Sequence, residues 1–223
     1  MVLRYSAFLS FIFPLTVSAL QSCQFVIVQW ATEGYRKFWA SSFERNKRYA
    51  EKHSYDYVLL DDDLILLELA GRPAHWGKIL ALQNTLHSIE QTNYSKENSH
   101  CEYLLWLDAD CFIVNFEQRL ESFISLDNKL GRVVQSPDCK GNTCRKTFPN
   151  MPWDLITTDA NMEGAFHVNN GAFLLRNSKW SRKFLQIWWQ QSPLPNGTID
   201  WFSHDQGGFW NAYLKVDSPA WAL

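Results

Sequence analysis

The most informative part of this chain is Glu102-Tyr103-Leu104-Leu105-Trp106-Leu107-Asp108-Ala109-Asp110. Its apolar run is short and bounded by polar residues, which is typical of a strand buried on both faces of a sheet. Two carboxylates follow the run at once. On extended backbone Asp108 and Asp110 point to the same side, and Ala109 points away from them. The sequence therefore predicts a buried strand with a paired acidic end.

The two carboxylates predict a metal site. Asp108 and Asp110 repel each other, and neither has an obvious basic partner nearby in the sequence. A divalent cation is the simplest way to stabilise the pair, and oxygen ligands suit Mn²⁺ or Mg²⁺, with phosphate oxygens in the open positions. The alternative interpretation is an acidic strand end that faces solvent, since short Asp-x-Asp matches occur by chance.

Strand-like and helix-like segments alternate on either side of this stretch. Residues 25–28 and 57–60 predict strands, and residues 76–90 predict a helix with its apolar positions on one face. This order is typical of an α/β domain whose mostly parallel sheet is flanked by helices. Ligands of such sheets bind beyond the carboxyl ends of the strands, where Asp108 and Asp110 fall.

The composition narrows the class of protein. A chain of 223 residues, 46% hydrophobic and 20% charged, is long and apolar enough for one globular domain. A net charge of −2, without a Lys/Arg cluster, argues against a nucleic-acid surface. The 11 Trp residues are expected mostly in the core, although some of the rings are suited to stacking on sugars.

Several features predict entry into the secretory pathway. Residues 1–22 combine an early basic residue, an uncharged apolar stretch and small residues at the end, which resembles a signal peptide. A short uncleaved membrane anchor is the alternative. Asn93 and Asn196 each begin a glycosylation sequon. We therefore expect residues 23–223 to form a single domain in the Golgi lumen.

Four short motifs stand in order along the chain: His75-Trp76-Gly77-Lys78, Trp106-Leu107-Asp108-Ala109-Asp110, Asn169-Asn170-Gly171-Ala172-Phe173-Leu174-Leu175-Arg176-Asn177 and His204-Asp205-Gln206-Gly207-Gly208. Together they resemble glycosyltransferases of the GT-A fold, and in particular glycosyltransferase family 34, the galactosyl-, mannosyl- and xylosyltransferase group. The segment from Asn169 to Trp189 is the most specific piece. The resemblance extends from Phe25 to the region of Tyr213 and implies a single Rossmann-like α/β domain.

The resemblance implies a retaining transfer of a hexosyl or pentosyl group from a nucleotide diphosphate sugar to a glycan acceptor. Asp108 and Asp110 would hold Mn²⁺, or Mg²⁺, against both phosphates, where the metal offsets the charge that develops on the leaving diphosphate. Asp108 would thereby also contact the donor. The base and ribose would lie near Gln29 to Thr32, which makes Ala31 and Thr32 donor-binding residues.

Further donor contacts are implied for Lys78 and for Asn169, Asn170 and Gly171. Lys78 would reach a phosphate or the sugar, and its alternative interpretation is a solvated lysine on a helix face. The two asparagines and Gly171 would contact sugar hydroxyls, with the glycine permitting close approach of the backbone. The alternative for these three residues is a tight turn, which Asn-Gly forms readily.

Asp205 and Gln206 match the family's catalytic Asp-Gln element near the anomeric carbon. A carboxylate there would stabilise an oxocarbenium-like transition state or attack it as a nucleophile, and both routes stay open. The alternative is an ordinary helix N-terminus, where Asp complements the helix dipole. Members of the family continue into a segment whose histidine completes the metal shell. This chain ends at Leu223 before such a residue, so we expect a truncated domain.

Two other functions compete with this interpretation. A non-catalytic relative would bind a nucleotide sugar or glycan without turnover. A haloacid-dehalogenase-type phosphatase also places two carboxylates after a strand, but Thr or Val is expected two residues after the second one, where this chain has Phe112. The donor sugar, the acceptor and the linkage depend on single hydroxyls or methylenes of a pocket, so the sequence leaves them open.

Overall fold

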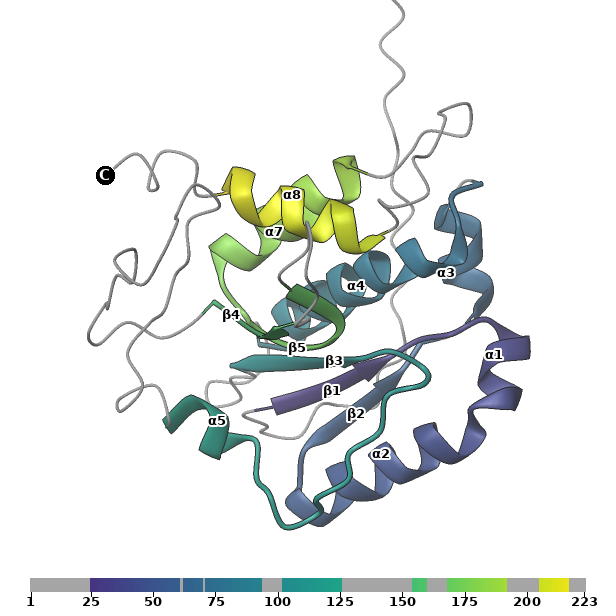
Figure 1. Cartoon of the computed structure of the whole chain (residues 1–223), viewed down its shortest axis with the longest axis vertical. Helices are drawn as coiled ribbons and strands as arrows, with labels where there is room; N and C mark the ends of the chain where they lie inside the picture. The colour runs from purple at the N-terminus through teal and green to yellow at the C-terminus, as the bar shows by residue number, and fades with distance from the viewer. Residues whose placement is uncertain are drawn as a thin grey trace, which may run out of the picture.

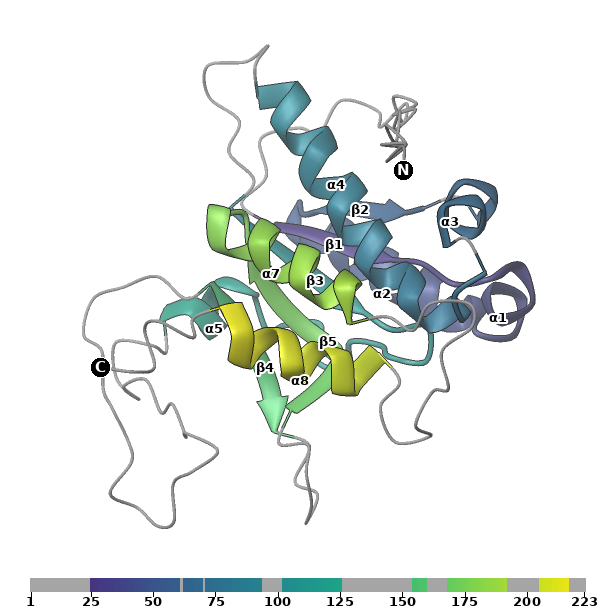
Figure 2. The same cartoon turned by 90° about the horizontal axis from the view of Figure 1, so that it is seen from above.

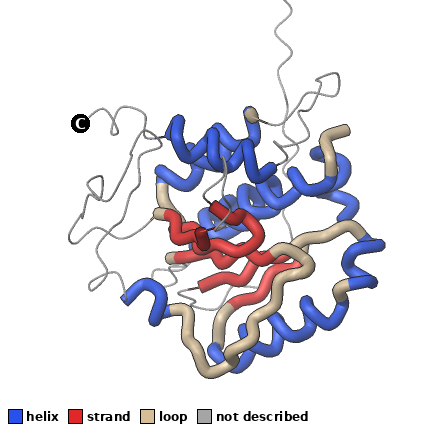
Figure 3. Tube along the Cα trace, viewed as in Figure 1, coloured by secondary structure: helices blue, strands red, loops and turns tan. Residues whose placement is uncertain are grey.

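The computed structural model describes residues 25–60, 62–69, 71–93, 102–125, 154–159, 168–191 and 205–216. Within these ranges the chain forms a five-stranded sheet with helices on both faces (Figures 1 and 3). The strands are β1 (Phe25–Gln29), β2 (Asp56–Leu59), β3 (Tyr103–Leu107), β4 (Leu155–Asp159) and β5 (Val168–Arg176). Their order across the sheet is β2-β1-β3-β5-β4, which places the predicted buried strand β3 in the middle.

The sheet is parallel on one side of β3 and antiparallel on the other. Ile27 of β1 lies opposite Leu105 of β3 in parallel register, and β2 is parallel to β1. β5 runs antiparallel to β3, with Leu174 opposite Leu105, and β4 runs antiparallel to β5. Only residues 160–167 separate β4 from β5, and so short a connection permits antiparallel but not parallel pairing. The predicted α/β fold with parallel core strands is confirmed, and its antiparallel half makes the sheet mixed.

Helices cover both faces of this sheet. Figure 2 shows α4, α7 and α8 lying over one face, and Figure 1 shows α2 along the other. The helices are α1 (Glu33–Phe38), α2 (Ala40–His53), α3 (Asp62–Leu69), α4 (Gly77–Asn93), α5 (Glu121–Ser125), α7 (Lys179–Gln190) and α8 (Asp205–Val216), with a short 3₁₀ turn η1 (Ala74–Trp76) before α4.

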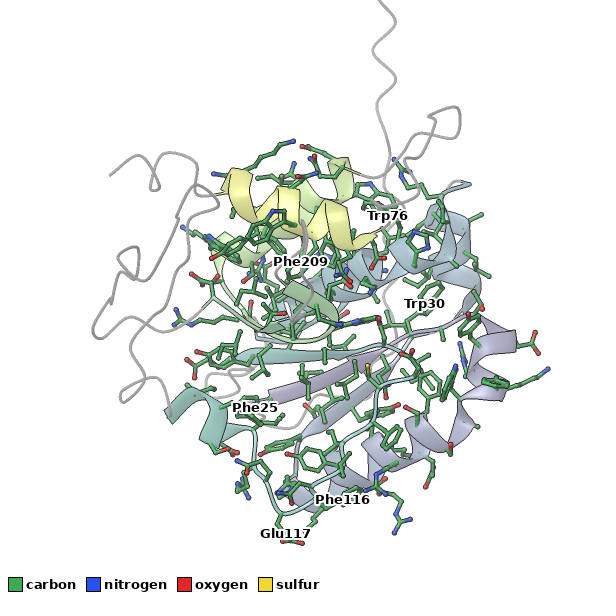
Figure 4. The ribbon with its side chains drawn as sticks, viewed as in Figure 1. Phe25, Trp30, Trp76, Phe116, Glu117 and Phe209 are labelled. Carbon is green, nitrogen blue, oxygen red and sulfur yellow. The ribbon has the colours of Figure 1, made fainter. Side chains whose placement is uncertain are left out.

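Successive residues of the central strands belong to two different cores, because side chains alternate between the faces of a sheet. The strand residues packed with α4, α7 and α8 are Val26, Val28, Leu104 and Trp106, and those packed with α2 are Phe25, Ile27, Tyr103 and Leu105. Figure 4 shows Trp76 and Phe209 on the first side of the sheet and Phe25 and Phe116 on the second. Burial on both faces explains why β3 is apolar throughout rather than alternating.

Two glycines bring η1 and the start of α4 close to the rest of the core. A Cβ on Gly77 would lie 2.2 Å from a ring carbon of Trp30, and a Cβ on Gly208 would lie 2.6 Å from a ring carbon of Trp76. Rings in a close-packed core cannot yield by that much without strain, so both positions require glycine. The contact between Trp76 and Gly208 sets the first turn of α4 beside α8.

Some sequence predictions fall outside the described residues. These are the signal peptide or anchor in residues 1–22, the sequon at Asn196, His204 and the chain end at Leu223. In the part of the chain that the structure does describe, every helix is too short or too polar to cross a membrane.

Candidate functional site

The acidic pair lies at the carboxyl end of β3, as predicted, but its backbone turns instead of staying extended. The Asp108 N–H donates to the Gly171 carbonyl at 2.7 Å, and the Cys111 N–H donates back to the Asp108 carbonyl at 2.9 Å. Asp108 is half-buried, whereas Asp110 is exposed. Ala109 points into a small apolar cluster, in agreement with the prediction that it points away from the carboxylates. The turn therefore gives the two acids different surroundings.

Asp108 has a basic partner that its neighbours in the sequence do not reveal. Lys78, in the first turn of α4, places its Nζ 2.9 Å from Asp108 Oδ1 and 2.7 Å from Asp205 Oδ2. The side chain of Lys78 is only 5% exposed, so the alternative of a solvated surface lysine is wrong. The Trp106 indole N–H also donates to Asp108 Oδ1, at 2.8 Å. One buried ammonium thus holds two carboxylates that lie 97 residues apart (205 − 108).

Asp205 occupies the first position of α8 and is buried by its surroundings. The Asn170 side-chain amide donates to Asp205 Oδ2 at 2.8 Å, and the Trp188 indole N–H donates to the Asp205 carbonyl at 2.8 Å. Lys78 Nζ lies 3.4 Å from the Asn170 carbonyl as well. Asp205 is therefore more than a helix-capping acid, because its carboxylate lies in the same hydrogen-bonded cluster as Lys78 and Asp108.

Burial and the neighbouring charges shift the pKa values in this cluster. Burial raises the pKa of Asp108, and Lys78 and the Trp106 N–H only partly oppose that rise. Burial by itself lowers the pKa of Lys78, but Asp205 and Asp108 outweigh it and hold this pKa above its usual value. Lys78 therefore stays an ammonium ion at neutral pH. This one ammonium lies between two acidic side chains.

Asn169, Asn170 and Gly171 lie in β5, beside the turn at Asp108. The alternative of a tight Asn-Gly turn is wrong, because the strand runs through all three positions. The Asn169 Oδ1 accepts the Gly171 N–H at 2.7 Å. A Cβ on Gly171 would lie 3.0 Å from Asn169 Oδ1 and 3.3 Å from Asp108 Oδ2, so glycine keeps the space beside the Asp108 carboxylate free.

The residues present fit a divalent cation bound mainly through Asp110. This carboxylate is exposed and has no cationic partner among the described residues. Within them it accepts a weak hydrogen bond from the Cys111 thiol, whose Sγ lies 3.7 Å from Oδ1. In the described ranges no three His, Cys, Asp or Glu side chains gather as a closed metal site. Two carboxylates with open positions are the arrangement expected for Mg²⁺ or Mn²⁺ that also binds phosphate oxygens and water.

The other predicted residues differ in how exposed they are. Ala31 is buried and packs with Phe43 and Ala109, so its side chain is not free to contact a ligand, whereas Thr32 at the start of α1 is half-exposed. Gln206 follows Asp205 in α8 and is half-exposed. Thr32 and Gln206 are thus more accessible than Ala31, although less so than the exposed Asn169 and Asp110.

The sequence did not reveal how three residues support the site: Asn46 was not named at all, and Gln29 and Trp106 were named without this role. Gln29 and Asn46 are completely buried and hydrogen-bonded behind the turn, and the Trp106 indole supports Asp108 from within β3. Asn46 did carry a signal. It lies at helical spacing between Phe43 and Tyr49 on the buried face of α2, where an amide is unexpected.

The fold is of the GT-A type found in nucleotide-sugar glycosyltransferases. The chain superimposes, with a TM-score of 0.52, on the crystal structure of a glycosyltransferase involved in the glycosylation of the major capsid of PBCV-1. The two share 16% sequence identity, and the match covers 84% of this chain and 74% of the other. At this identity the likeness establishes the fold.

Sequence comparison identifies the family. Residues 12–213 match the galactosyl transferase GMA12/MNN10 family, and the chain belongs to this family. The resemblance that the four motifs indicated is therefore confirmed.

Two relatives are longer than this chain and match it over part of their length. It is 30% identical over 173 residues to the probable alpha-1,6-mannosyltransferase MNN10 of Saccharomyces cerevisiae, covering 72% of this chain and 37% of the relative. It is 24% identical over 162 residues to an alpha-1,2-galactosyltransferase of Schizosaccharomyces pombe, covering 68% of this chain and 40% of that protein. The chain thus spans about two-fifths of the length of these relatives.

Proposed function

We propose that this chain forms the donor-binding and catalytic part of a metal-dependent hexosyltransferase that acts on a glycan acceptor and retains the configuration of the transferred sugar. The observation that carries the proposal is the cluster of Lys78, Asp108, Asn170 and Asp205, with the exposed Asp110 beside it. Family membership and the mannosyl- and galactosyltransferase names of the relatives support a hexose donor, and they disfavour a phosphatase.

Different residues of the site suit the diphosphate and the sugar of a nucleotide sugar. Asp110, with Asp108 behind it, would hold Mn²⁺ or Mg²⁺, which when bound offsets negative charge on a leaving diphosphate. Gly171 leaves space beside Asp108 for a close approach. The exposed Asn169 amide offers hydrogen bonds to sugar hydroxyls, whereas the buried Asn170 amide holds Asp205. The donor sugar would then lie between β5 and the start of α8.

Asp205 is the residue we assign to the chemistry. Its carboxylate is buried, fixed by Lys78 and Asn170, and so already oriented before a substrate arrives. A preoriented carboxylate stabilises the positive charge that develops at an anomeric carbon without waiting for solvent to reorganise. Two hydrogen bonds on Asp205 Oδ2 reduce its nucleophilicity, which favours electrostatic stabilisation over covalent attack.

The proposal is tested by donor binding to the full chain, measured by titration calorimetry with and without Mn²⁺, across UDP-galactose, UDP-glucose, UDP-xylose and GDP-mannose. We expect a hexose donor to bind only with the metal, and Asp110→Asn to lose that binding while keeping the fold. Glu44→Gln removes an exposed carboxylate from the outer side of α2 and serves as the matched control. Equal donor affinity in Asp110→Asn and the parent would refute the assignment of Asp110.

Transfer is tested separately from binding. With the donor that binds, product linkage is read by NMR from the anomeric proton. UDP-galactose and GDP-mannose carry α-linked sugars, so retention yields an α-linked product. A β-linked product would contradict retention. Donor binding without any transfer or donor hydrolysis would instead identify a non-catalytic binder.

A further inference from the structure

A buried asparagine of α2 holds the backbone that follows the acidic turn. Asn46 is completely buried, and its amide makes three hydrogen bonds. Its Oδ1 accepts the Ile113 N–H at 2.9 Å, and its Nδ2 donates to the Cys111 carbonyl at 2.9 Å and to Gln29 Oε1 at 3.1 Å. The bonds use the oxygen and both N–H groups of the amide, so they define its orientation.

Gln29 carries the same network to the other side of the turn. Its Oε1 also accepts the Tyr57 hydroxyl at 3.0 Å, and its Nε2 donates to the Asp108 carbonyl at 3.4 Å. The Asp108 carbonyl accepts the Cys111 N–H as well. Asn46 and Gln29 therefore fix the peptide groups on both sides of Asp110, at Asp108 and at Cys111.

Two further residues of α2, the buried Ser42 and the exposed Arg45, hold the same segment. The Ser42 hydroxyl donates to the Cys111 carbonyl at 2.7 Å. The Arg45 guanidinium donates to the Ile113 carbonyl at 2.7 Å and to the Val114 carbonyl at 3.0 Å. Side chains of α2 thus hold the backbone at Cys111, Ile113 and Val114, and Asn46 is the completely buried member of this set.

Burying the Asn46 amide costs free energy unless it is hydrogen-bonded, and here all three of its hydrogen bonds are made. A polar group without partners is unfavourable on a buried helix face, and a fully bonded network mainly makes its surroundings rigid and specific. The Asp110 side chain has no cationic partner among the described residues, so the backbone on either side of it determines where its carboxylate points. That backbone is what Asn46 holds.

We propose that Asn46 is a positioning residue that fixes the direction of the Asp110 carboxylate, so that this carboxylate binds a divalent cation without rearrangement of the turn. The inference rests on the proposed function, since it concerns the cation site described there. It adds a residue on a different helix, one that contacts neither the cation nor a substrate.

The test compares four forms of the full chain: the parent, Asn46→Ala, Ser42→Ala and Tyr49→Phe. Ser42→Ala removes one of the two side-chain hydrogen bonds on the Cys111 carbonyl and is the milder change. Tyr49→Phe is the matched control, because Tyr49 lies one turn further along α2, is equally buried, and bonds to Gln118, away from the acidic turn. The measurements are Mn²⁺ binding by electron paramagnetic resonance and hydrogen exchange of the peptides that cover residues 108–114.

We expect Asn46→Ala to bind Mn²⁺ about 10-fold more weakly, the lower end of the effect seen for groups that orient metal ligands. Amide exchange over residues 108–114 should become faster in the same variant. Ser42→Ala should show a smaller effect of the same kind, which keeps the test decisive if Asn46→Ala does not fold. Tyr49→Phe should bind Mn²⁺ like the parent.

Unchanged Mn²⁺ affinity in both Asn46→Ala and Ser42→Ala, with a parent that binds the metal, would overturn this inference and leave the proposed function standing. An equal loss of affinity in Tyr49→Phe would overturn it too, because the effect would then be general loosening of α2. A parent that binds no Mn²⁺ would instead refute the metal dependence in the proposed function, and the inference with it.

Discussion

Replacing Lys78 by methionine tests the central electrostatic feature of the site. Lys78→Met keeps a long side chain in the same space but removes the cation between Asp108 and Asp205, whose oxygens lie 2.9 and 2.7 Å from Nζ. Removing one partner of a buried ion pair costs about 3–5 kcal/mol, because the remaining charge is left without compensation. Two carboxylates are left here, so we expect a loss of folding free energy of about 3–5 kcal/mol at neutral pH.

The loss should shrink as the pH falls. Without Lys78, burial and the nearby Asp205 raise the pKa of Asp108 in the folded variant still further above its value in the unfolded chain. A raised carboxyl pKa means that the folded variant binds a proton more tightly, so it gains stability as the pH falls. In the parent, the two carboxylates hold the pKa of Lys78 above its usual value, so its contribution persists at acidic and neutral pH and is lost only in the alkaline range.

The assay is urea unfolding of the parent and of Lys78→Met at about pH 7.5 and about pH 5. As the pH falls, the difference in unfolding free energy between them should narrow by up to ~1.4 kcal/mol per pH unit for each extra proton that the folded variant binds. Lys37→Met is the control, because Lys37 pairs with Glu33 in an exposed i,i+4 ion pair and its removal should leave stability almost unchanged. A loss below about 1 kcal/mol for Lys78→Met, or a loss that does not depend on pH, would refute the reasoning.

Three further substitutions, at Asp205, Gly77 and Gly171, test the chemistry, the core and the donor site. Asp205→Asn should keep donor binding but lower the transfer rate by about 10²–10³-fold, as measured by initial rates at saturating donor; an unchanged rate would remove Asp205 from the chemistry. Gly77→Ala should destabilise the fold by about 1–3 kcal/mol in urea unfolding, since the added Cβ meets the Trp30 ring; a smaller loss would show that the ring moves freely. Gly171→Ala should weaken donor binding in calorimetry more than it lowers the unfolding midpoint, because the new methyl group crowds Asp108 Oδ2; the reverse ranking would assign Gly171 to the fold alone.

Much of the fold was predictable because strands and helices leave local patterns of apolar residues in the sequence. The apolar run at Tyr103–Leu107 became the central strand, and the periodic segment after Trp76 became α4. The antiparallel half of the sheet was not predicted, because strand direction depends on which neighbour β5 pairs with, and that pairing is a long-range contact.

The sequence was enough to predict most residues of the candidate site, but not the contacts between them. Asp108, Asn170 and Asp205 were all named from the sequence, and they do lie together. Their common link through Lys78 was not foreseen, because Lys78 lies 30 residues before Asp108 and still further from Asp205. The three side chains meet only in the tertiary structure. Ala31 was named as well, yet its side chain packs into an apolar cluster.

Periodicity and short motifs are properties of neighbouring residues, so the amino-acid sequence alone was enough to predict most helices and strands, the acidic end of the central strand and the family. Which charges meet could be seen only in the folded chain. Packing buried Lys78 between Asp108 and Asp205, set Asn46 behind the turn, and left Asp110 exposed. The physical reason is that burial and ion pairing depend on contacts between segments far apart in the chain, and these exist only once the helices have packed on the sheet.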